Sequence, residues 1–443
     1  MRSLPTATPP KEPEPMIILG SLFILCVLLL IGVSVPLAFG GVLVFIGVFG
    51  GHDVTGFLPT GHWKMNSIVL LAIPLFILAG AIMERGRIAA PLVSVAELLV
   101  GRIHGGLSAA AVFASGIFGS ISGSAAATLT CIGSIMMPHL KAANYPRGPA
   151  AALIVAACPL GLLIPPSSSQ ILYAWVAQQS VLKCFLSTVV PGLILITLLC
   201  MVNYVLMRKA DLKLLERPAS YPQEFVRRGG RAFPALLMPI IILGGIYGGI
   251  MTPTEAAGVA VIYAIPVGLF IYRGLTPQNI WPTLRYAGTT IGVVMLMVFV
   301  VVIVSRFLVF EDIPGMAKDL IFSISDNPIV ILLMVNLVMI LIGMLMDDIS
   351  GLLLSAPLLL PIVQSVGMDP VHFAAVLGVN LGMANITPPT APLLYLGAKV
   401  TDTPVSEMLK PTFIMILFAW LPTLLITTFV PEVALWLPNF VFG

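Results

Sequence analysis

Residues Gly119 to Gly133 read GSISGSAAATLTCIG, and the interpretation of the whole chain starts from this stretch. It contains three serines, two threonines and three glycines, it has no charge, and apolar runs lie on both sides of it. Glycine lets a chain turn tightly and approach a neighbour closely, and hydroxyl groups supply oxygen atoms. The stretch therefore predicts a turn that presents oxygen atoms in apolar surroundings.

The composition of the chain explains those surroundings. Of its 443 residues, 58% are hydrophobic and only 9% are charged, whereas a soluble globular protein has roughly 25% charged residues. A bilayer core needs about 20 apolar residues per helix, and on this rule we expect about 11 spans. The composition predicts an all-α polytopic membrane protein without a soluble domain.

The chain repeats one order of markers in two halves. Pro138 precedes the double proline Pro165-Pro166 by 27 residues, and Pro361 precedes Pro388-Pro389 by the same 27 residues. Duplicated halves are typical of secondary transporters, whose binding site lies near the midplane between broken helices. The expected divisions are an N-terminal polar tail 1–16, a first membrane repeat 17–207, a basic loop 208–233, a second membrane repeat 234–430 and a C-terminal segment 431–443.

Each double proline interrupts an apolar stretch, Ala151 to Ile164 in the first half and Val371 to Ile386 in the second. Proline lacks an amide donor and does not continue a helix. Carbonyl groups freed in this way are tolerated at membrane depth only where protein or a water-lined cavity satisfies them. The pattern predicts broken helices at about residues 148–180 and 371–400, with a simple proline kink as the alternative.

A counterpart of the opening stretch precedes the second break, where Met346 to Pro361 reads MDDISGLLLSAPLLLP. Both stretches have a Ser-Gly core between apolar arms that are short for two full spans. Short arms that meet at such a turn predict re-entrant hairpins, at about residues 112–138 and 343–365. Hydroxyl and carbonyl oxygens at the turns and breaks favour Na⁺. A tight helix-packing surface is the alternative.

Four charged residues in apolar settings are further candidates. Asp347 and Asp348 follow an apolar run, and acids inside a membrane are functional candidates because they are costly there; ending a helix at the surface is the alternative. Glu255 follows a proline at an expected helix start, which favours a capping role. Arg306 ends an apolar run and is interpreted as an interfacial anchor, with contact to an anionic substrate as the alternative.

The orientation follows from one loop. Seven of the 22 basic residues lie between positions 208 and 231, namely Arg208, Lys209, Lys213, Arg217, Arg227, Arg228 and Arg231. By the positive-inside rule we expect this loop to face the cytoplasm, and because topology alone accounts for its charge we expect no nucleic-acid partner.

The sequence favours a transporter over an enzyme. Its five cysteines and five histidines are scattered, and it has no HExxH, GxSxG or GxxxxGK[ST] motif. We therefore expect no catalytic residues, no cofactor, and no metal other than Na⁺ as a coupling ion.

At this point the residues match a known family. The stretch GSISGSAAATLTCIGSIMMPHLKAANYPR, followed by LLIPPSSSQILYA and later by NITPPTAPLLY, resembles the large membrane subunit of tripartite ATP-independent periplasmic (TRAP) transporters, the DctM-like family of the ion-transporter superfamily. The resemblance extends from about Ile17 to Val430. It implies two inverted repeats and an elevator-type fold in which a transport domain moves against a scaffold domain. It also implies Na⁺-coupled uptake of a small organic anion, a carboxylate or sulfonate, across a bacterial inner membrane.

The resemblance further implies partners and site residues. The partners are a small four-helix membrane subunit (DctQ-like), expected on a separate chain because no further span precedes Ile17, and a periplasmic substrate-binding protein (DctP-like). Cation sites are implied where each hairpin turn meets a helix break. The matching residues are Ser122, Gly123, Ser124, Gly161, Pro165 and Ser167 in the first half, and Asp348, Ser350, Gly351, Thr387, Pro388 and Thr390 in the second. Substrate contacts are expected at Ser168, Ser169 and Asn385.

One alternative function remains within the same superfamily. A stand-alone Na⁺- or H⁺-coupled dicarboxylate or citrate symporter would share the hairpins and breaks but would need no partner protein.

Overall fold

The computed structural model describes residues 15–49, 56, 58–213 and 220–443, and every regular element in these ranges is helical. Nearly all of the expected polar tail and part of the basic loop lie outside the described residues. The first half of the chain forms α1 (Pro15–Leu30), α2 (Val35–Phe49), α3 (Leu58–Met65), η2 (Val69–Leu71), α4 (Ala72–Arg85), α5 (Ala89–Val100), α6 (Gly106–Ser122), α7 (Ala125–Ala142), α8 (Arg147–Ala157), α9 (Leu160–Leu163), α10 (Ser168–Val176) and α11 (Val181–Met207).

The second half of the chain is also entirely helical where it is described. It forms α12 (Tyr221–Tyr247), α13 (Pro253–Pro266), η3 (Val267–Ile271), α14 (Pro277–Phe310), α15 (Ile313–Ile324), α16 (Pro328–Leu345), α17 (Asp348–Ser365), α18 (Pro370–Ala384), α19 (Pro392–Thr401), α20 (Val405–Met415), η4 (Ile416–Trp420), α21 (Leu421–Phe429) and α22 (Pro431–Phe442).

The number of membrane-length helices is lower than the sequence predicts. Within the described residues, 7 helices are long and apolar enough to cross a bilayer, or up to 9 if each of two bent pairs is one span. This count of the described helices is below the expectation of about 11 because several apolar runs form shorter helices, among them α2, α6 and α18. The class, an all-helical polytopic membrane protein, is confirmed.

Two helical hairpins lie where the Ser-Gly turns are. Helices α6 and α7 meet at Gly123, whose φ of 60° is a left-handed conformation that glycine adopts without steric cost. Helices α16 and α17 meet at Met346 and Asp347. Both hairpins extend beyond their expected bounds, and each arm of the second has 18 residues, which is long enough for a span.

Both expected breaks interrupt helices. The pair formed by Arg147–Leu163 and Ser168–Val176 is bent by 44° around the first double proline. In the second half, α18 ends at Ala384 and α19 begins at Pro392, on either side of the other double proline. The peptide bonds Pro165–Pro166 and Pro388–Pro389 are both cis.

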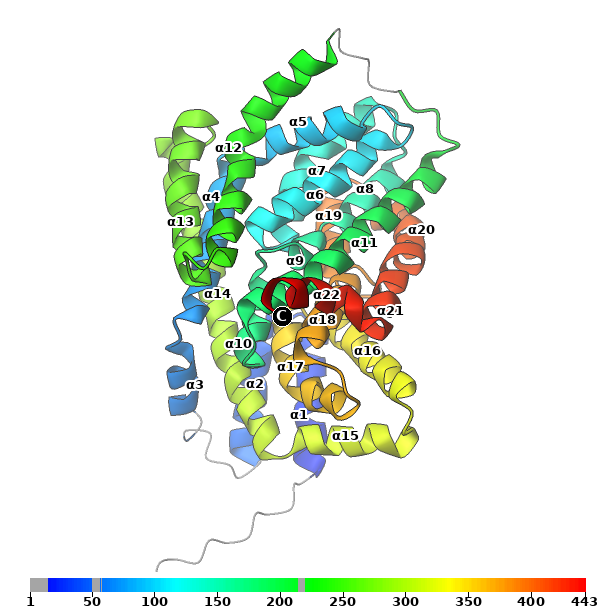
Figure 1. The fold of residues 1–443 in the computed structure, drawn as a ribbon. Helices are drawn as coiled ribbons and strands as arrows, with labels where there is room; N and C mark the ends of the chain where they lie inside the picture. The colour runs from blue at the N-terminus through cyan, green and yellow to red at the C-terminus, as the bar shows by residue number, and fades with distance from the viewer. Residues whose placement is uncertain (1–14, 50–55, 57, 214–219) are drawn as a thin grey trace, which may run out of the picture.

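The two halves repeat the same helix contacts. Hairpin helix α7 packs against α19, and its counterpart α17 packs against α10. In the same way, α11 packs against α18, and α20 packs against α8. Figure 1 shows α5, α6 and α7 toward one end of the molecule and α15 and α17 toward the other, so the equivalent elements approach from opposite ends. This is the arrangement of inverted repeats.

Side chains cap the helices that begin at the turns. Ser124 caps α7 by accepting a hydrogen bond from Ala127 N, and Asp347 caps α17 by accepting one from Ile349 N. At the start of α13, Thr252 and Glu255 form a reciprocal capping box. The capping role predicted for Glu255 is therefore confirmed.

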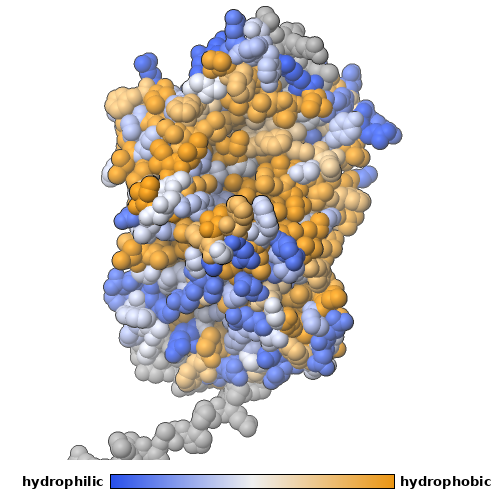
Figure 2. Space-filling model, viewed as in Figure 1, coloured by the Kyte–Doolittle hydropathy of each residue, from blue (hydrophilic) through white to orange (hydrophobic). Residues whose placement is uncertain are grey.

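The described basic residues gather at one end of the molecule. There Lys213 N, after α11, donates to Ala143 O at the end of α7, and a guanidinium nitrogen of Arg228 on α12 donates to Ser94 O on α5. The opposite end, where Figure 1 shows α3, the end of α14 and α15, contains the described basic residues Lys64, Lys183, Arg306 and Lys318. Figure 2 shows a broad hydrophobic belt across the upper and middle part of one face and hydrophilic residues over its lower part.

Candidate functional site: two hairpin turns and two helix breaks

The first hairpin turn brings three oxygen atoms together. Ser122 Oγ lies 3.1 Å from Thr128 Oγ1 and 3.4 Å from the carbonyl oxygen of Ser124, and Thr128 Oγ1 donates to that carbonyl at 2.8 Å. Both Ser122 and Thr128 are buried. We call these three atoms the first oxygen cluster. All three are uncharged oxygen ligands of the kind that a small hard cation prefers.

The first broken helix lies directly against this cluster. A Cβ atom added at Gly161 would come within 3.2 Å of Thr128 Oγ1 and 3.4 Å of Ser124 O, and one added at Gly119 would come within 2.5 Å of Gly161 Cα. Contacts this short between two backbones require glycine on both helices. The two glycines therefore let α9 approach the hairpin at the oxygen cluster.

The turn itself contacts the first break. Ser168 Oγ donates to the carbonyl oxygen of Gly123 at 2.9 Å. A Cβ atom at Gly123 would lie 3.2 Å from Pro166 O and 3.4 Å from Ser168 N, so a side chain there would crowd the break as well as strain the turn. The backbone of the turn and the start of α10 therefore form one packed unit.

The second hairpin turn is organised around two acids. Asp347 Oδ1 accepts a hydrogen bond from Ser350 Oγ, which also contacts Met297 Sδ on α14. Gly351 packs against Leu381 in the last turn of α18, just before the second break. The polar groups of this turn are thus partly satisfied within the hairpin.

The second break contacts the second hairpin through one side chain. Thr390 Oγ1 donates to the carbonyl oxygen of Met344 at the end of α16, whereas Thr387 Oγ1 donates to Met383 O of its own helix at 2.7 Å. Pro388 lines a small apolar cavity together with Leu409 and Phe413 of α20. Of these three expected site residues, Thr390 is the one that links the break to the hairpin.

The first break joins the two halves. Ser168 bonds to the first turn, and the next residue, Ser169, donates to Asp348 Oδ2 of the second turn at 3.3 Å. The following residue, Gln170, donates to Ala374 O on α18 at 3.2 Å. Three consecutive side chains of α10 therefore contact the first hairpin, the second hairpin and the second broken helix.

Two buried oxygen atoms at the breaks have no hydrogen-bond partner within the described part of the chain. Ser167, next to Pro166, is 0% exposed and its Oγ is unpaired, and Asn385, just before the second break, is 3% exposed with Oδ1 unpaired. Most buried polar atoms in proteins are paired, and an exception indicates an absent water, ion or ligand. Each break thus presents one oxygen atom that is available to a bound group.

The structure brings more of the expected site residues together in the first half of the chain than in the second. In the first half Ser122, Ser124, Gly161 and Ser168, the last of them expected as a substrate contact, lie together at the first turn. In the second half Asp348 accepts a hydrogen bond from Ser169 of the first break, whereas the Thr387 hydroxyl bonds to Met383 of its own helix. Thr128 was missed by the sequence reasoning, although its spacing of four residues from Ser124 places it on the same helix face one turn beyond the hairpin tip.

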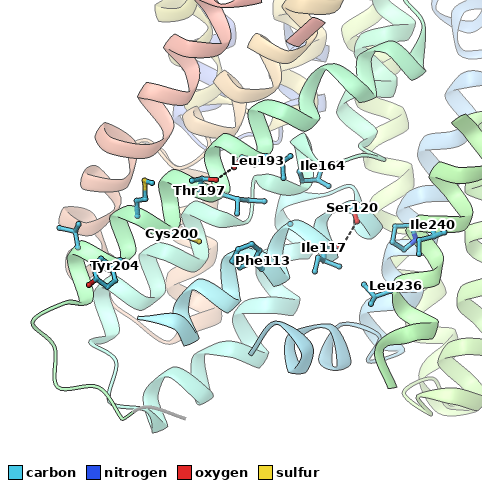
Figure 3. Close-up of a pocket in the computed structure, with 15 residues that line it drawn as sticks. Phe113, Ile117, Ser120, Ile164, Leu193, Thr197, Cys200, Tyr204, Leu236 and Ile240 are labelled. Carbon is cyan, nitrogen blue, oxygen red and sulfur yellow. Dashed lines mark hydrogen bonds between the residues drawn. The ribbon is translucent and has the colours of Figure 1, made fainter. Parts of the chain in front are cut away.

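A large apolar cavity borders the first hairpin and Ile164, just before the first break. It has a volume of about 1060 Å³ and runs between α6, α11 and α12, as Figure 3 shows. Two of its polar side chains are already satisfied by their own helices, because Ser120 Oγ donates to Ile117 O at 2.7 Å and Thr197 Oγ1 to Leu193 O at 2.9 Å. The rest of the lining is almost wholly apolar, so this groove suits hydrocarbon and offers little to an anion.

The described residues show no cluster of three or more histidine, cysteine or acidic side chains that could hold a metal ion. His372 is buried and its Nε2 lies 2.6 Å from Thr427 O, so it belongs to the packing between α18 and α21.

The fold and the paired turns and breaks define a polytopic membrane protein of the secondary-transporter class. Residues 22–433 match the family model described as the tripartite ATP-independent periplasmic transporter, DctM component. The chain belongs to this DctM family.

Curated relatives share the family. The C4-dicarboxylate TRAP transporter large permease protein of Pseudomonas aeruginosa is 36% identical over 84% of this chain and 86% of its own length. The sialic acid TRAP transporter large permease protein of Vibrio cholerae is 34% identical over 86% of this chain and 88% of its own. An isethionate TRAP transporter permease of Oleidesulfovibrio alaskensis is 32% identical over 95% of this chain, which spans 66% of that longer protein.

Solved structures share the fold at low sequence identity. The YdaH transporter of Alcanivorax borkumensis matches with a TM-score of 0.57 at 15% identity, over 88% of each chain. MtrF of Neisseria gonorrhoeae, described as an antimetabolite efflux pump, matches with a TM-score of 0.57 at 13% identity, over 96% of each chain.

Proposed function

We propose that this chain is the large permease subunit of a TRAP transporter that takes up a small organic anion by coupling it to Na⁺. The observation that carries the proposal is the meeting of both hairpin turns at Ser168 and Ser169 of the first break. Unpaired oxygen atoms of Ser167 and Asn385 lie at the two breaks. These contacts and unpaired oxygens support a site at the turns and breaks, with oxygen atoms for cations and hydroxyl or amide groups for a carried anion.

The substrate class follows from the chemistry of the region and of the relatives. Serine hydroxyls and the Asn385 amide can donate hydrogen bonds to a carboxylate or sulfonate. The relatives named above are transporters of C4-dicarboxylate, sialic acid and isethionate, all of them small organic acids. We infer a carboxylate or sulfonate anion for this chain as well.

Na⁺ coupling provides enough free energy for accumulation. Each cation that enters a cell gains roughly 2.3 kcal/mol per 100 mV of membrane potential, and a tenfold Na⁺ gradient adds about 1.4 kcal/mol per ion. Two ions supply roughly 7 kcal/mol, of which about 2.3 kcal/mol is offset by a monovalent anion moving against the potential. The remainder of about 5 kcal/mol supports accumulation of roughly a few thousandfold.

The proposed movement is of the elevator type. The hairpins and broken helices pack with one another, whereas α4, α12, α13 and α14 form a connected set in which α4 packs against α13 and α14. We assign the first group to a transport domain and the second to a scaffold. The transport domain would slide past α14, which touches the second turn through Met297 and Ser350.

The family description names a tripartite periplasmic system. We therefore propose a small four-helix membrane subunit and a periplasmic binding protein as partners, and the bacterial inner membrane as the location. The concentration of basic residues at the end with the loop 208–233 supports a cytoplasmic position for that end.

The first prediction tests the coupling. A thermal-shift screen of the cognate binding protein with succinate, sialic acid and isethionate would select the anion. Proteoliposomes with both membrane subunits, supplied with that loaded binding protein, should then take up the anion when external Na⁺ is present. Equal uptake with choline in place of Na⁺ would reject Na⁺ coupling.

The stand-alone symporter remains the second candidate, since the structural neighbours establish only the shared fold. It predicts uptake by this chain alone, without a binding protein. Uptake that appears only after the binding protein is added would exclude it.

A further inference from the structure

A polar cleft lies at the end of the molecule opposite the basic loop. It consists of two adjoining cavities of about 500 and 180 Å³ that share Lys64 of α3 and Trp175 of α10. Their linings also include Gln178 and Gln179 after α10 and Arg306 on α14. We call this the outer cleft. Figure 1 shows α3, α10 and the end of α14 in this lower region, and Figure 2 shows hydrophilic residues over it.

The outer cleft has unpaired positive charge. Lys64 and Arg306 line the smaller cavity together with the hydroxyl residues Thr60 and Ser305. Neither cation has a hydrogen bond or ion pair with the residues that the structure describes. Among the described residues, the linings of both cavities contain no acid, and the acids that follow Arg306 in the chain, Glu311 and Asp312, are not part of them.

The position of the cations argues against simple anchoring in the bilayer. An interfacial anchor extends outward along the lipid-facing side of its helix. Here the two cations come from separate helices and border one cavity. Trp175 of α10 and Pro357 of α17, the second arm of the second hairpin, also line this cavity. Lys64 and Arg306 are both exposed, so salt screens their charge, but at low ionic strength a cleft lined by one sign of charge raises the local concentration of counter-ions.

The outer cleft leads toward the candidate site along two helices. On α10, Trp175 lies six residues beyond Ser169, or about 9 Å at 1.5 Å per residue. On α14, Arg306 lies nine residues beyond Met297, which contacts Ser350 of the second turn, or about 14 Å. The cleft is thus the outer end of the seam between α14 and the pair α10 and α17, and the turns lie at its inner end.

We propose that the outer cleft is an access site for a small organic anion, whose carboxylate or sulfonate is held by Lys64 and Arg306 beside Trp175 before the anion moves along the seam. This inference rests on the proposed function, because it assigns the path by which the carried anion reaches the turns. The amides of Gln178 and Gln179 supply further hydrogen-bond donors for hydroxyl or carboxyl groups of the anion.

The test uses iodide as an anionic quencher of Trp175 fluorescence in the purified full chain. The exposed tryptophans Trp63, Trp281 and Trp436 are replaced by phenylalanine in the parent and in every variant alike, because Trp63 also lines the larger cavity, and Trp420, which is fully buried, is shielded from quenchers. Lys64→Gln with Arg306→Gln should lower the iodide quenching constant at least threefold at low salt. Quenching by neutral acrylamide should stay unchanged, and the iodide effect should vanish at about 0.5 M salt because charge is screened there.

A matched pair of variants and a competition experiment complete the test. Lys183→Gln with Lys318→Gln removes the other described cations of this end and should leave iodide quenching unchanged. Millimolar succinate or isethionate should protect Trp175 from iodide in the parent protein and not in the Lys64 and Arg306 variant. The access site is ruled out if the Lys64 and Arg306 variant keeps the iodide quenching constant of the parent. It is also ruled out if the Lys183 and Lys318 variant loses as much quenching as the Lys64 and Arg306 variant.

The result is separable from that of the uptake experiment. The quenching needs neither Na⁺ nor a partner, so an intact outer cleft together with Na⁺-independent uptake would reject the coupling alone. Na⁺-coupled uptake together with iodide quenching that ignores Lys64 and Arg306 would reject the cleft alone.

Discussion

At the scale of single residues, the first oxygen cluster offers the cation that we propose a set of oxygen atoms without a full charge. Ser122, Ser124 and Thr128 supply two hydroxyls and one carbonyl in a buried setting, where a carboxylate would be costly unless paired. Uncharged oxygen atoms bind a cation less strongly than a carboxylate does. This suits the proposed coupling ion, which has to be released inside the cell. The second turn, with Asp347 and Asp348, is built differently.

The second prediction concerns Thr128. Thr128→Val keeps the side-chain shape but removes the hydroxyl that contacts Ser122 and Ser124. Losing one oxygen ligand of about 1–2 kcal/mol should raise the Na⁺ concentration for half-maximal thermal stabilisation of the purified chain about tenfold.

The control is Thr130→Val on the same helix, whose hydroxyl donates only to Ala126 O on a more exposed face. Its Na⁺ response should match that of the parent protein. The first oxygen cluster is not the cation site if the two variants respond to Na⁺ alike.

At the scale of elements, close helix contact determines where the hairpins sit. The first hairpin approaches α9 through Gly119 and Gly161, and the second approaches α18 through Gly343 and Gly351, where Cβ atoms would meet Ala384 and Leu381. Without strong hydrophobic attraction between helices inside a membrane, such small-residue contacts stabilise their packing. The same glycines therefore serve both packing and the placement of oxygen atoms.

The third prediction tests this contact. In Gly119→Ala the new methyl group would meet the backbone of Gly161 at 2.5 Å, so α6 and α9 have to separate. We expect a Tm lower by several degrees and loss of stabilisation by Na⁺ in a thermal-shift measurement.

Gly258→Ala on α13 is the matched control, since nothing lies within 4 Å of its added Cβ. Alanine is favoured over glycine within a helix by roughly 0.5–1 kcal/mol, so this variant should keep or slightly raise the Tm. Equal Tm values for the two variants would show that the contact at Gly119 is not tight.

At the scale of the whole molecule, charge and symmetry act together. The two halves make equivalent contacts from opposite ends, so their turns meet in the interior while their outer surfaces face different sides. The basic residues distinguish the two sides, because most described cations lie near the loop 208–233 and two of those at the far end line the outer cleft. The repeats therefore account for the proposed site, and the uneven distribution of charge is the basis of the proposed orientation in the membrane.

The fourth prediction tests that direction. In a background with Cys26 and Cys200 replaced by serine, Ser323→Cys on α15 should react with a membrane-impermeant maleimide in intact spheroplasts. Lys213→Cys in the basic loop should react only after the membrane is permeabilised, because basic loops remain on the cytoplasmic side. Labelling of Lys213→Cys in intact spheroplasts would reverse the proposed orientation.

Much of the architecture is predictable from local chemistry. Hydropathy indicates the membrane class, the double prolines indicate both breaks, and the Ser-Gly pairs indicate both turns, because each of these signals acts within a few residues. Hydropathy predicts more spans than the described helices show because it also acts locally. The apolar runs of α2 and α6 do not reveal that each folds into a helix shorter than a full span.

The sequence by itself determined the class of protein, its duplication, and the position of the turns and breaks. Only the tertiary structure decided that Ser169 meets Asp348 across the two halves, that Thr128 completes the first oxygen cluster, and that Thr387 does not reach the second turn. It also decided that Arg306 shares a cavity with Lys64, where the sequence favoured an anchor. The reason is that proline, glycine and hydropathy act on the backbone locally, whereas a site is made by side chains far apart in sequence that helix packing brings within hydrogen-bonding distance.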